Sequence, residues 1–354
     1  HKYTVDRHLV ETCVEASSLI RKVARPDLLV VAAILHDLGK GQGRDHSIAG
    51  EPIAIEVARR IGFPAADVKV IGTLVRWHLL LAQTATTRDL DDPATIAMVT
   101  DSISTREELD LLTALTQADA KATGDKAWTN WRANLISELA RRAHQQLEVG
   151  ELPARVPEPV VIPQAVLSDP TKVIVDLRAV ADGSQMRVIS GERLGLLADV
   201  AGMLGLAKIS IRTARAWPQT VDGMPVAVSE WHTDAHAFDA AELRQRLEAV
   251  AQRRVQADDR LRRSEPAGLE PFAMLHPRAS EHATVLEVRA TDRPGLVYQI
   301  CAALAGVQVS VTSAHLDTVG PQAVDFFYLQ DKDRAPLSSG HAQQAVEAVL
   351  VALS

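Results

Sequence analysis

The chain has 354 residues, of which 47% are hydrophobic and 23% are charged. These globular proportions exclude a wholly disordered or fibrous chain, and the length predicts two to four domains. The net charge of −7 and the isoelectric point near 6.0 disfavour a broad nucleic-acid-binding face. Two cysteines are too few for a disulfide framework or a cysteine-based zinc site, and no apolar run reaches the length of a membrane span. We expect a cytoplasmic protein.

The first part of the chain is predicted to be all-helical. Apolar residues recur at helical spacing there, and no segment alternates with the period of two that marks a strand. Helices are predicted over 6–23, 28–38, 46–61, 67–81, 93–103, 106–122 and 128–149. Five prolines then predict a linker or an extended surface segment, because they cannot continue a helix: Pro153, Pro157, Pro159, Pro163 and Pro170.

After this linker, strand-like runs alternate with amphipathic helices, and the pattern occurs twice. The segment LGLLADVAGML at 194–204 matches PGLVYQICAAL at 294–304, an offset of 100 residues. Further along, Trp231 matches Tyr328 at an offset of 97, which gives the first copy three extra residues. Each copy reads as strand, helix, strand, strand, helix. A fourth strand is predicted near Pro271–Leu275 and is assigned to the first copy.

The strongest chemical signal is a set of histidines and aspartates in the helical part. His36 and Asp37 lie about 100° apart around a helix axis, yet both can reach one metal ion near the helix end. Together with His8 on the preceding helix and Asp119 on a later helix, they form the pattern H…HD…D. Two imidazoles and two carboxylates suit a divalent ion such as Mn²⁺, Mg²⁺, Fe²⁺ or Zn²⁺.

Further polar residues extend this candidate site. His46 and His78 are candidates for a second metal position, so that two ions would hold a phosphoester between them. Lys40 and Arg44 lie in a glycine-rich loop and are candidates to neutralise phosphate, while Asp45 is a candidate acid or base. A single histidine on a helix is usually structural, but the whole set in one helical domain predicts a metal site.

The pattern H…HD…D with the context HDLGK resembles the HD superfamily of metal-dependent phosphohydrolases. The wider context resembles the HD domain of the bifunctional PII-uridylyltransferase/uridylyl-removing enzyme family. The segments that carry this resemblance are HKYTVDRH (1–8), LHDLGKGQGRDHS (35–47), RWHLL…TATTRDLDDP (76–93) and LTQADAKATGDKAWTNW (115–131). The two repeats resemble ACT domains, which this family carries after its HD domain.

The resemblance implies a multidomain chain, with an all-α HD domain followed by two α+β ACT domains of ferredoxin-like βαββαβ fold. The expected boundaries are 1–152 for the HD domain, 153–170 for the proline-rich linker, and 171–276 and 277–354 for the ACT domains. In this family a nucleotidyltransferase domain with a Gly-Ser and Asp-x-Asp signature stands upstream. That signature is not found here, so we do not expect this chain alone to transfer a nucleotide.

The resemblance also implies an activity, a partner and an effector. The HD domain would hydrolyse the nucleotidyl–tyrosine phosphodiester on the PII nitrogen-signalling protein, with Mn²⁺ or Mg²⁺ as the expected metal. Its metal residues carry over to His8, His36, Asp37 and Asp119, with His46 and His78 as additional site residues. The ACT pair would sense glutamine. Some relatives remove an adenylyl group rather than a uridylyl group, and the sequence does not decide between them.

In ACT domains, the amino acid binds near the first strand–helix turn and the facing second strand. The corresponding residues of the second copy are Asp292, Arg293, Gly295, Leu296, Val309 and Ser310, and those of the first copy are Glu192, Gly195 and Ser210. Leu194 stands where the proline is usual, so the first copy is expected to bind weakly or to serve in packing.

Two other functions stay open at this point. The first is hydrolysis of a small nucleotide such as the alarmone (p)ppGpp. The enzymes that hydrolyse this alarmone also pair HD and ACT modules. Those enzymes carry a synthetase-like segment between the modules, where this chain has a linker of about twenty residues. The second is a non-catalytic fragment whose ACT pair works as an amino-acid sensor while the metal site is idle.

Overall fold

The computed structural model of this chain describes residues 3–43, 45–124, 127–150, 152, 157–180, 182–234, 239–252, 261, 269–277, 279–319 and 321–354. The chain forms two compact units. The first comprises His1–Thr86 and Pro93–Ala154, and the second comprises Thr87–Asp92 and Arg155–Ser354. Among the described residues, no helix is both long and apolar enough to cross a membrane.

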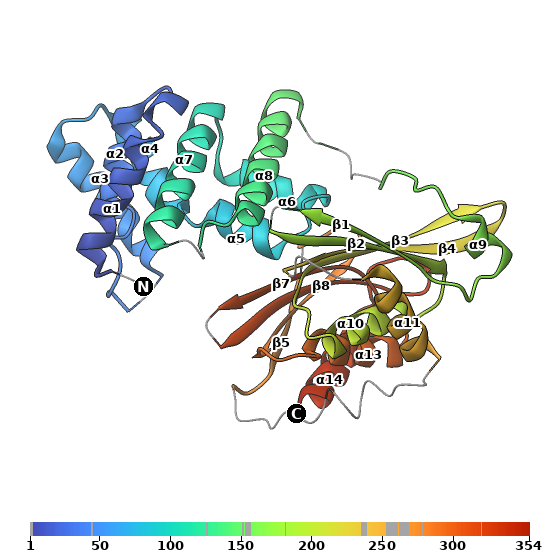
Figure 1. The fold of residues 1–354 in the computed structure, drawn as a ribbon. Helices are drawn as coiled ribbons and strands as arrows, with labels where there is room; N and C mark the ends of the chain where they lie inside the picture. Colours follow the sequence, from blue (N-terminus) through green and yellow to red (C-terminus); the bar gives the residue numbers. More distant parts are fainter. Residues whose placement is uncertain are drawn as a thin grey trace. The chain divides into compact units, whose positions relative to one another are not determined.

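The described residues of the first unit form helices and turns, as predicted (Figure 1). The elements are α1 (Val5–Ser17), the 3-10 helix η1 (Ile20–Lys22), α2 (Pro26–Leu35), α3 (His46–Ile61), α4 (Ala65–Trp77), α5 (Leu80–Thr87), α6 (Pro93–Ser102), α7 (Arg106–Thr123) and α8 (Asn130–Val149). The helices predicted over 28–38 and 67–81 end earlier than expected, at Leu35 and Trp77. Each of these breaks is followed at once by a histidine.

A buried apolar core aligns the helices of this unit. Leu28 and Leu29 on α2, Ile71 and Leu74 on α4, and Leu112 on α7 are all fully buried. The three helices pack on one another, and α1 packs on α2 and α7. Burial of such side chains stabilises the fold by about 1.5–3 kcal/mol each. The core therefore fixes the ends of α2 and α4 beside α1 and α7.

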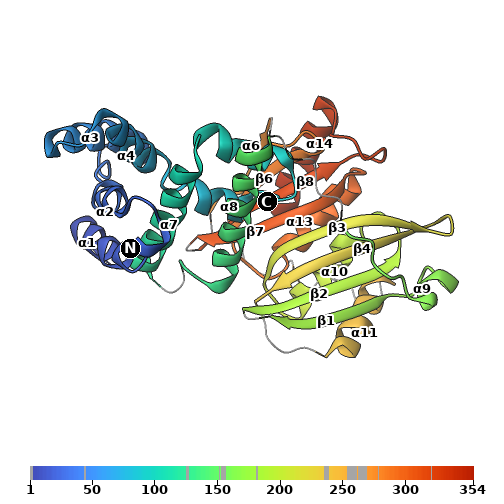
Figure 2. The same ribbon diagram turned by 90° about the horizontal axis from the view of Figure 1, so that it is seen from above.

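The second unit combines one large antiparallel sheet with helices. Its elements are α9 (Gln164–Ser168), β1 (Ile174–Val180), β2 (Gly183–Gly191), α10 (Leu196–Leu206), β3 (Ile211–Val221), β4 (Met224–Thr233), α11 (Ala240–Ala251), β5 (Phe272–His276), β6 (Thr284–Thr291), α13 (Leu296–Gly306), β7 (Ser310–Val319), β8 (Gln322–Gln330) and α14 (Ser339–Leu353). The eight strands lie in the order β1-β2-β4-β3-β7-β8-β6-β5, and Figure 2 shows this sheet from one side.

The two copies of the repeat join through strands β3 and β7, which pair antiparallel in the middle of the sheet. Each copy has the order β-β-α-β-β-α, so its edge strand comes before the core of the repeat and not after it as in the expected βαββαβ order. The strand predicted near Pro271–Leu275 is β5, and it pairs with β6 of the second copy. Its assignment to the first copy was therefore wrong.

The strand register also corrects the alignment of the two copies. Met186 lies opposite Trp231 in the first copy, and Leu286 lies opposite Phe327 in the second. Trp231 therefore corresponds to Phe327, at an offset of 96, and not to Tyr328. The first copy therefore has four extra residues between Ala214 on β3 and Trp231 on β4, one more than the sequence suggested. Both Trp231 and Phe327 are fully buried, which explains why an aromatic residue stands at this position in each copy.

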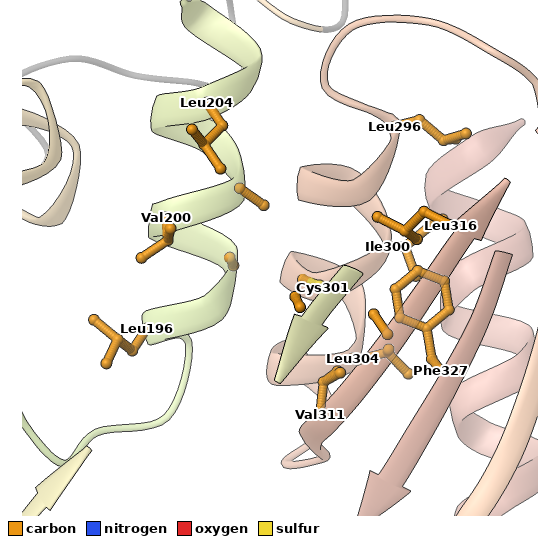
Figure 3. Packing of buried hydrophobic residues seen from close by; sticks show 14 of the residues in the cluster. Leu196, Val200, Leu204, Leu296, Ile300, Cys301, Leu304, Val311, Leu316 and Phe327 are labelled. Carbon is orange, nitrogen blue, oxygen red and sulfur yellow. The ribbon is translucent and has the colours of Figure 1, made fainter. Parts of the chain in front are cut away.

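Helices α10 and α13 pack side by side and form the centre of the apolar core (Figure 3). Val200 and Leu204 on α10, and Ile300 and Leu304 on α13, are fully buried in it. The two helices also approach each other through small residues. A Cβ atom placed on Gly205 would lie only 3.2 Å from the Cα atom of Gly295. One continuous core therefore joins both copies of the repeat.

Substitution of Gly295 tests whether the strand–helix turn of the second copy requires glycine. Its φ of +87° lies in the left-handed region, and an added Cβ would lie 2.7 Å from the Cβ of Leu261. Gly295→Ala should therefore destabilise the second unit by about 1–3 kcal/mol. Gly306→Ala is the control, because a Cβ there meets nothing within 4 Å. Thermal unfolding measures both variants, and equal transition temperatures for the two would contradict this view of the turn.

Candidate metal centre and effector pockets

Five elements bring all six predicted metal residues together. His8 comes from α1 and Asp119 from α7, while His46 is the first residue of α3. The other three follow helix ends: His36 and Asp37 come directly after α2, and His78 comes directly after α4. His8, His36, Asp37 and His78 are buried, and each is at most 4% exposed.

Asp37 lies at the centre of this cluster. Its Oδ2 atom is 3.7 Å from Nε2 of His8 and 3.5 Å from Nε2 of His36. Its Oδ1 atom is 3.4 Å from Nε2 of His46 and 3.7 Å from Nε2 of His78. Each carboxylate oxygen therefore faces its own pair of imidazoles. The ligand atoms form two groups that can each hold a metal ion, and both groups contain Asp37.

Asp119 lies beside the first of these groups, near His8 and His36. Its Oδ1 atom is 2.9 Å from Nε2 of His8 and 3.7 Å from Nε2 of His36. The four residues of the pattern H…HD…D thus surround one position, and His46 and His78 complete the other with Asp37. In this arrangement, called bridged below, one carboxylate could serve two ions.

Hydrogen bonds at the backs of two rings set their orientation. Nδ1 of His36 is 2.8 Å from the carbonyl oxygen of Ala33, and Nδ1 of His78 is 2.8 Å from that of Val75. A carbonyl oxygen only accepts, so Nδ1 carries a hydrogen in both rings and Nε2 faces the cluster, where it offers a lone pair when the ring is neutral. Nε2 of His36 is buried and has no hydrogen-bond partner among the described residues. A metal ion would satisfy this orphaned atom, so the residues fit a metal.

The electrostatics keep the carboxylates anionic. Burial alone would raise the pKa of Asp37 and of Asp119, but hydrogen bonds and the charge of His36 outweigh it and hold both pKa values well below their usual range. Burial likewise opposes the charge on His36, but the Asp119 and Asp37 carboxylates raise its pKa to about 9. Burial, aided by His36, lowers the pKa of His78 to about 4, so its imidazole is neutral at pH 7. The site thus offers anionic oxygens and a neutral nitrogen to a cation.

Glycine shapes the loop that carries this site. A Cβ atom on Gly39 would lie 2.0 Å from the carbonyl oxygen of His46 and 2.6 Å from the backbone nitrogen of Gly50. Only glycine lets the loop lie so close to α3. This contact fixes the distance between the His36-Asp37 pair and His46, which begins α3.

The three predicted catalytic residues have different surroundings. Nζ of Lys40 contacts Oδ2 of Asp37, so this ammonium lies at the edge of the cluster. The carboxylate of Asp45 caps α3, since it accepts hydrogen bonds from the backbone nitrogens of Ser47 at 2.9 Å and Ile48 at 3.3 Å. Asp45 therefore positions His46, which follows it. Arg44 lies outside the described residues.

The predicted effector residues line two pockets of the second unit, in a grouping that the sequence did not suggest. Glu192 and Gly195 of the first copy share a pocket of about 260 Å³ with Val309 and Ser310 of the second. Ser210 of the first copy shares a pocket of about 220 Å³ with four residues of the second: Asp292, Arg293, Gly295 and Leu296. Each pocket therefore combines the turn of one copy with the strand of the other. The reason is the β3–β7 pairing, which only the fold reveals.

The two pockets differ in one buried residue that sequence reasoning missed. Asp325 lines the smaller pocket and is 3% exposed. By the corrected register its counterpart in the larger pocket is Ser229, which accepts a hydrogen bond of 2.9 Å from the indole nitrogen of Trp231. Burial, with the carboxyls of Asp292 and Asp317 nearby, raises the pKa of Asp325 well above its usual range. The available signal was a lone aspartate on a strand face otherwise made of apolar residues.

Two family models match this chain, in the order that the structure shows. Residues 5–106 match the HD domain, and residues 284–337 match the ACT domain. This chain contains an HD domain followed by an ACT domain. The matched residues of the HD domain include five of the six side chains of the metal centre, and the matched ACT domain is the second copy of the repeat.

Curated relatives match almost the whole chain. A bifunctional uridylyltransferase/uridylyl-removing enzyme of Streptomyces coelicolor is 38% identical, over 97% of this chain and 47% of the relative. Enzymes with the same name from Mycobacterium tuberculosis and Ruegeria pomeroyi are 35% and 30% identical, over 92% and 99% of this chain and 43% and 46% of the relatives. The chain thus spans about half the length of the curated relatives it matches.

The shared role of Asp37 is tested by metal content. Asp37→Asn should lose both metal positions, because the carboxylate belongs to both ligand groups. His46→Ala should lose only one, because the group of His8, His36 and Asp37 remains. Elemental analysis after dialysis against Mn²⁺ should give two equivalents for the parent chain, one for His46→Ala and none for Asp37→Asn. Full metal content in Asp37→Asn would contradict the bridged arrangement.

Proposed function

We propose that this chain removes the uridylyl group from the modified PII signalling protein, by hydrolysis of the nucleotidyl–tyrosine phosphodiester, and that glutamine regulates this reaction. The observation that carries the proposal is the cluster in which Asp37 serves two ligand groups inside an HD domain. The similar enzymes bear the name uridylyl-removing. We place the reaction in the cytoplasm, where a PII protein would be its partner.

The bridged cluster suits a phosphodiester. Divalent ions held by the six side chains would polarise the phosphoryl oxygen and lower the pKa of water for attack on phosphorus. The protein contributes fixed ligands: the rings of His36 and His78 are held from behind by carbonyl oxygens, and Asp37 joins the two groups. The attack would break the bond between phosphorus and the tyrosyl oxygen. UMP would be released, and the partner would keep a free tyrosine.

The substrate would approach from one side of the cluster. The side chains of Lys40 and His46 are 25% and 28% exposed, whereas those of His8, His36, Asp37 and His78 are at most 5% exposed. Lys40 and His46 thus form the rim that solvent reaches. The Lys40 ammonium can offset charge on the incoming phosphate there, as cations do in phosphate sites.

Hydrolysis of modified PII tests this proposal. The chain with Mn²⁺ should convert UMP-modified PII to the free protein, followed by mass spectrometry, and His36→Ala should lower the rate at least a hundredfold because a buried metal ligand is lost. AMP-modified PII is the parallel substrate, and preference for it would reassign the nucleotide. A chain with full metal content that releases neither nucleotide would contradict the proposal and favour the sensor alternative, whereas release of pyrophosphate from (p)ppGpp would favour the small-nucleotide alternative.

Glutamine is proposed to bind in the smaller pocket. Helix α13 begins at this pocket, and the partial positive charge of a helix N-terminus suits an amino-acid carboxylate. Asp325 provides a buried carboxyl group, and an ammonium group bound beside it would favour its anionic form. The larger pocket has a similar turn at Gly195 but holds Ser229 in place of Asp325. This difference supports the second turn as the amino-acid site, in accord with the weaker binding expected at Leu194.

Asp325→Asn should weaken glutamine binding about tenfold or more, because an amide cannot become the anion that a bound ammonium group would favour at this position. Glu192→Gln is the matched control, since it removes a carboxylate from the other pocket. Isothermal titration calorimetry measures both variants. Equal affinity in Asp325→Asn and the parent chain, or a loss confined to Glu192→Gln, would overturn the assignment to the smaller pocket.

A further inference from the structure

We infer that residues 87–92, here called the docked segment, carry the effector signal between the ACT pair and the metal centre. These six residues belong to the second unit, although the chain before and after them belongs to the first. The inference rests on the proposed regulation by an amino acid. It adds the physical route of that regulation and the residues that make it.

Hydrogen bonds and an ion pair hold the docked segment to the sheet. The backbone nitrogen of Asp89 donates to the hydroxyl oxygen of Tyr328 at 2.9 Å. The guanidinium of Arg88 donates to the carbonyl oxygen of Ala279 at 3.2 Å, and the guanidinium of Arg215 pairs with the carboxylate of Asp91. The contacts involve backbone and side chains alike, so the segment is bound at several points.

The segment is also folded on itself. The backbone nitrogen of Asp91 donates to Oδ1 of Asp89 at 2.9 Å, and that of Asp92 donates to the carbonyl oxygen of Asp89 at 3.2 Å. Asp92 is only 8% exposed. A compact turn with this much internal bonding moves as one piece, so a shift of the sheet would carry the whole segment with it.

Both copies of the repeat take part in this contact. Arg215 lies on β3 of the first copy, opposite Ser313 on β7, within the strand pair that joins the copies. Tyr328 lies on β8 of the second copy. Its neighbour Phe327 belongs to the helix-side core, while Tyr328 packs with Ala279 in a separate cluster. The docked segment therefore lies on the sheet face opposite α10 and α13, and we infer that it responds to the relative position of the two copies.

The two pockets flank these contact residues along the same strands. On β3, the larger pocket is lined by residues 216–218 and the smaller one by Ile211. On β7, the larger pocket is lined by residues 310–312 and the smaller one by residues 316–318. The junction pairs of β3 and β7, from Thr213 to Arg215, lie between them. A ligand in either pocket thus contacts both joining strands next to the segment.

Few residues separate the docked segment from the candidate metal centre along the chain. His78, a residue of the metal centre, precedes Thr87 by nine residues, and helix α5 occupies most of that interval. A helix transmits displacement along its axis, since its backbone hydrogen bonds resist bending. A shift of the docked segment would therefore reach the end of α4 and the ring of His78.

The test uses two arginines that lie on either side of Glu230 in the sheet. Arg215→Met removes the ion pair to Asp91. Arg187→Met is the matched control, because Arg187 pairs with Glu230, which lies opposite both arginines in the strand register. Hydrogen exchange of the chain is followed with and without saturating glutamine. In the parent chain, glutamine should change exchange about fivefold or more both in β3 and β7 and in residues 80–92.

Arg215→Met should keep the change in β3 and β7 and lose it in residues 80–92, whereas Arg187→Met should behave like the parent chain. A response of residues 80–92 that survives in Arg215→Met would overturn the inference, as would a parent chain in which only β3 and β7 respond.

If glutamine changes nothing in β3 and β7, the proposed effector is wrong. Mn²⁺ then serves as the probe, because coupling is reciprocal: it should alter exchange in β7 and β8 in the parent chain but not in Arg215→Met, and no alteration would overturn the inference.

Discussion

The metal centre depends on one buried carboxylate. Asp37 faces His8 and His36 with one oxygen and His46 and His78 with the other, so each neighbouring helix must present its histidine at a fixed distance. Three local features hold the histidines in place. Helices α2 and α4 end at Leu35 and Trp77, Asp45 caps the start of α3, and Gly39 lets the loop approach α3 closely. The cluster holds two carboxylates, Asp37 and Asp119, and the Lys40 ammonium contacts only the first, which favours a further cation as a partner of the cluster.

The second constraint is the pairing of β3 with β7. It joins two copies of one repeat into a single sheet with a common core of α10 and α13 (Figure 3). Because the copies face each other across this junction, each pocket takes its turn from one copy and its strand from the other. The same junction carries Arg215, which holds the docked segment through Asp91. The proposed effector binding and the inferred communication thus share two strands.

Much of this organisation could be predicted from the sequence, because it rests on periodicity and on motif spacing. The all-helical first part, the repeat and the six metal residues all follow from such local signals. The remainder depends on pairing between distant strands, which leaves no local trace. The partner of β5 and the correspondence of Trp231 with Phe327 required the strand register. Ser210 could be assigned to the pocket at Gly295 only once the junction of the two copies was known. The structure adds a role for Asp45, a predicted acid or base: its carboxylate caps a helix, as acidic residues at helix starts commonly do.

The most direct test of this account is the location of metal ions in crystals grown with Mn²⁺, measured by anomalous scattering at the manganese edge. The account predicts two peaks, one beside His8, His36 and Asp119 and one beside His46 and His78, with an oxygen of Asp37 bound to each. A single peak, or two peaks that do not share Asp37, would contradict the central claim that this carboxylate bridges two metal positions.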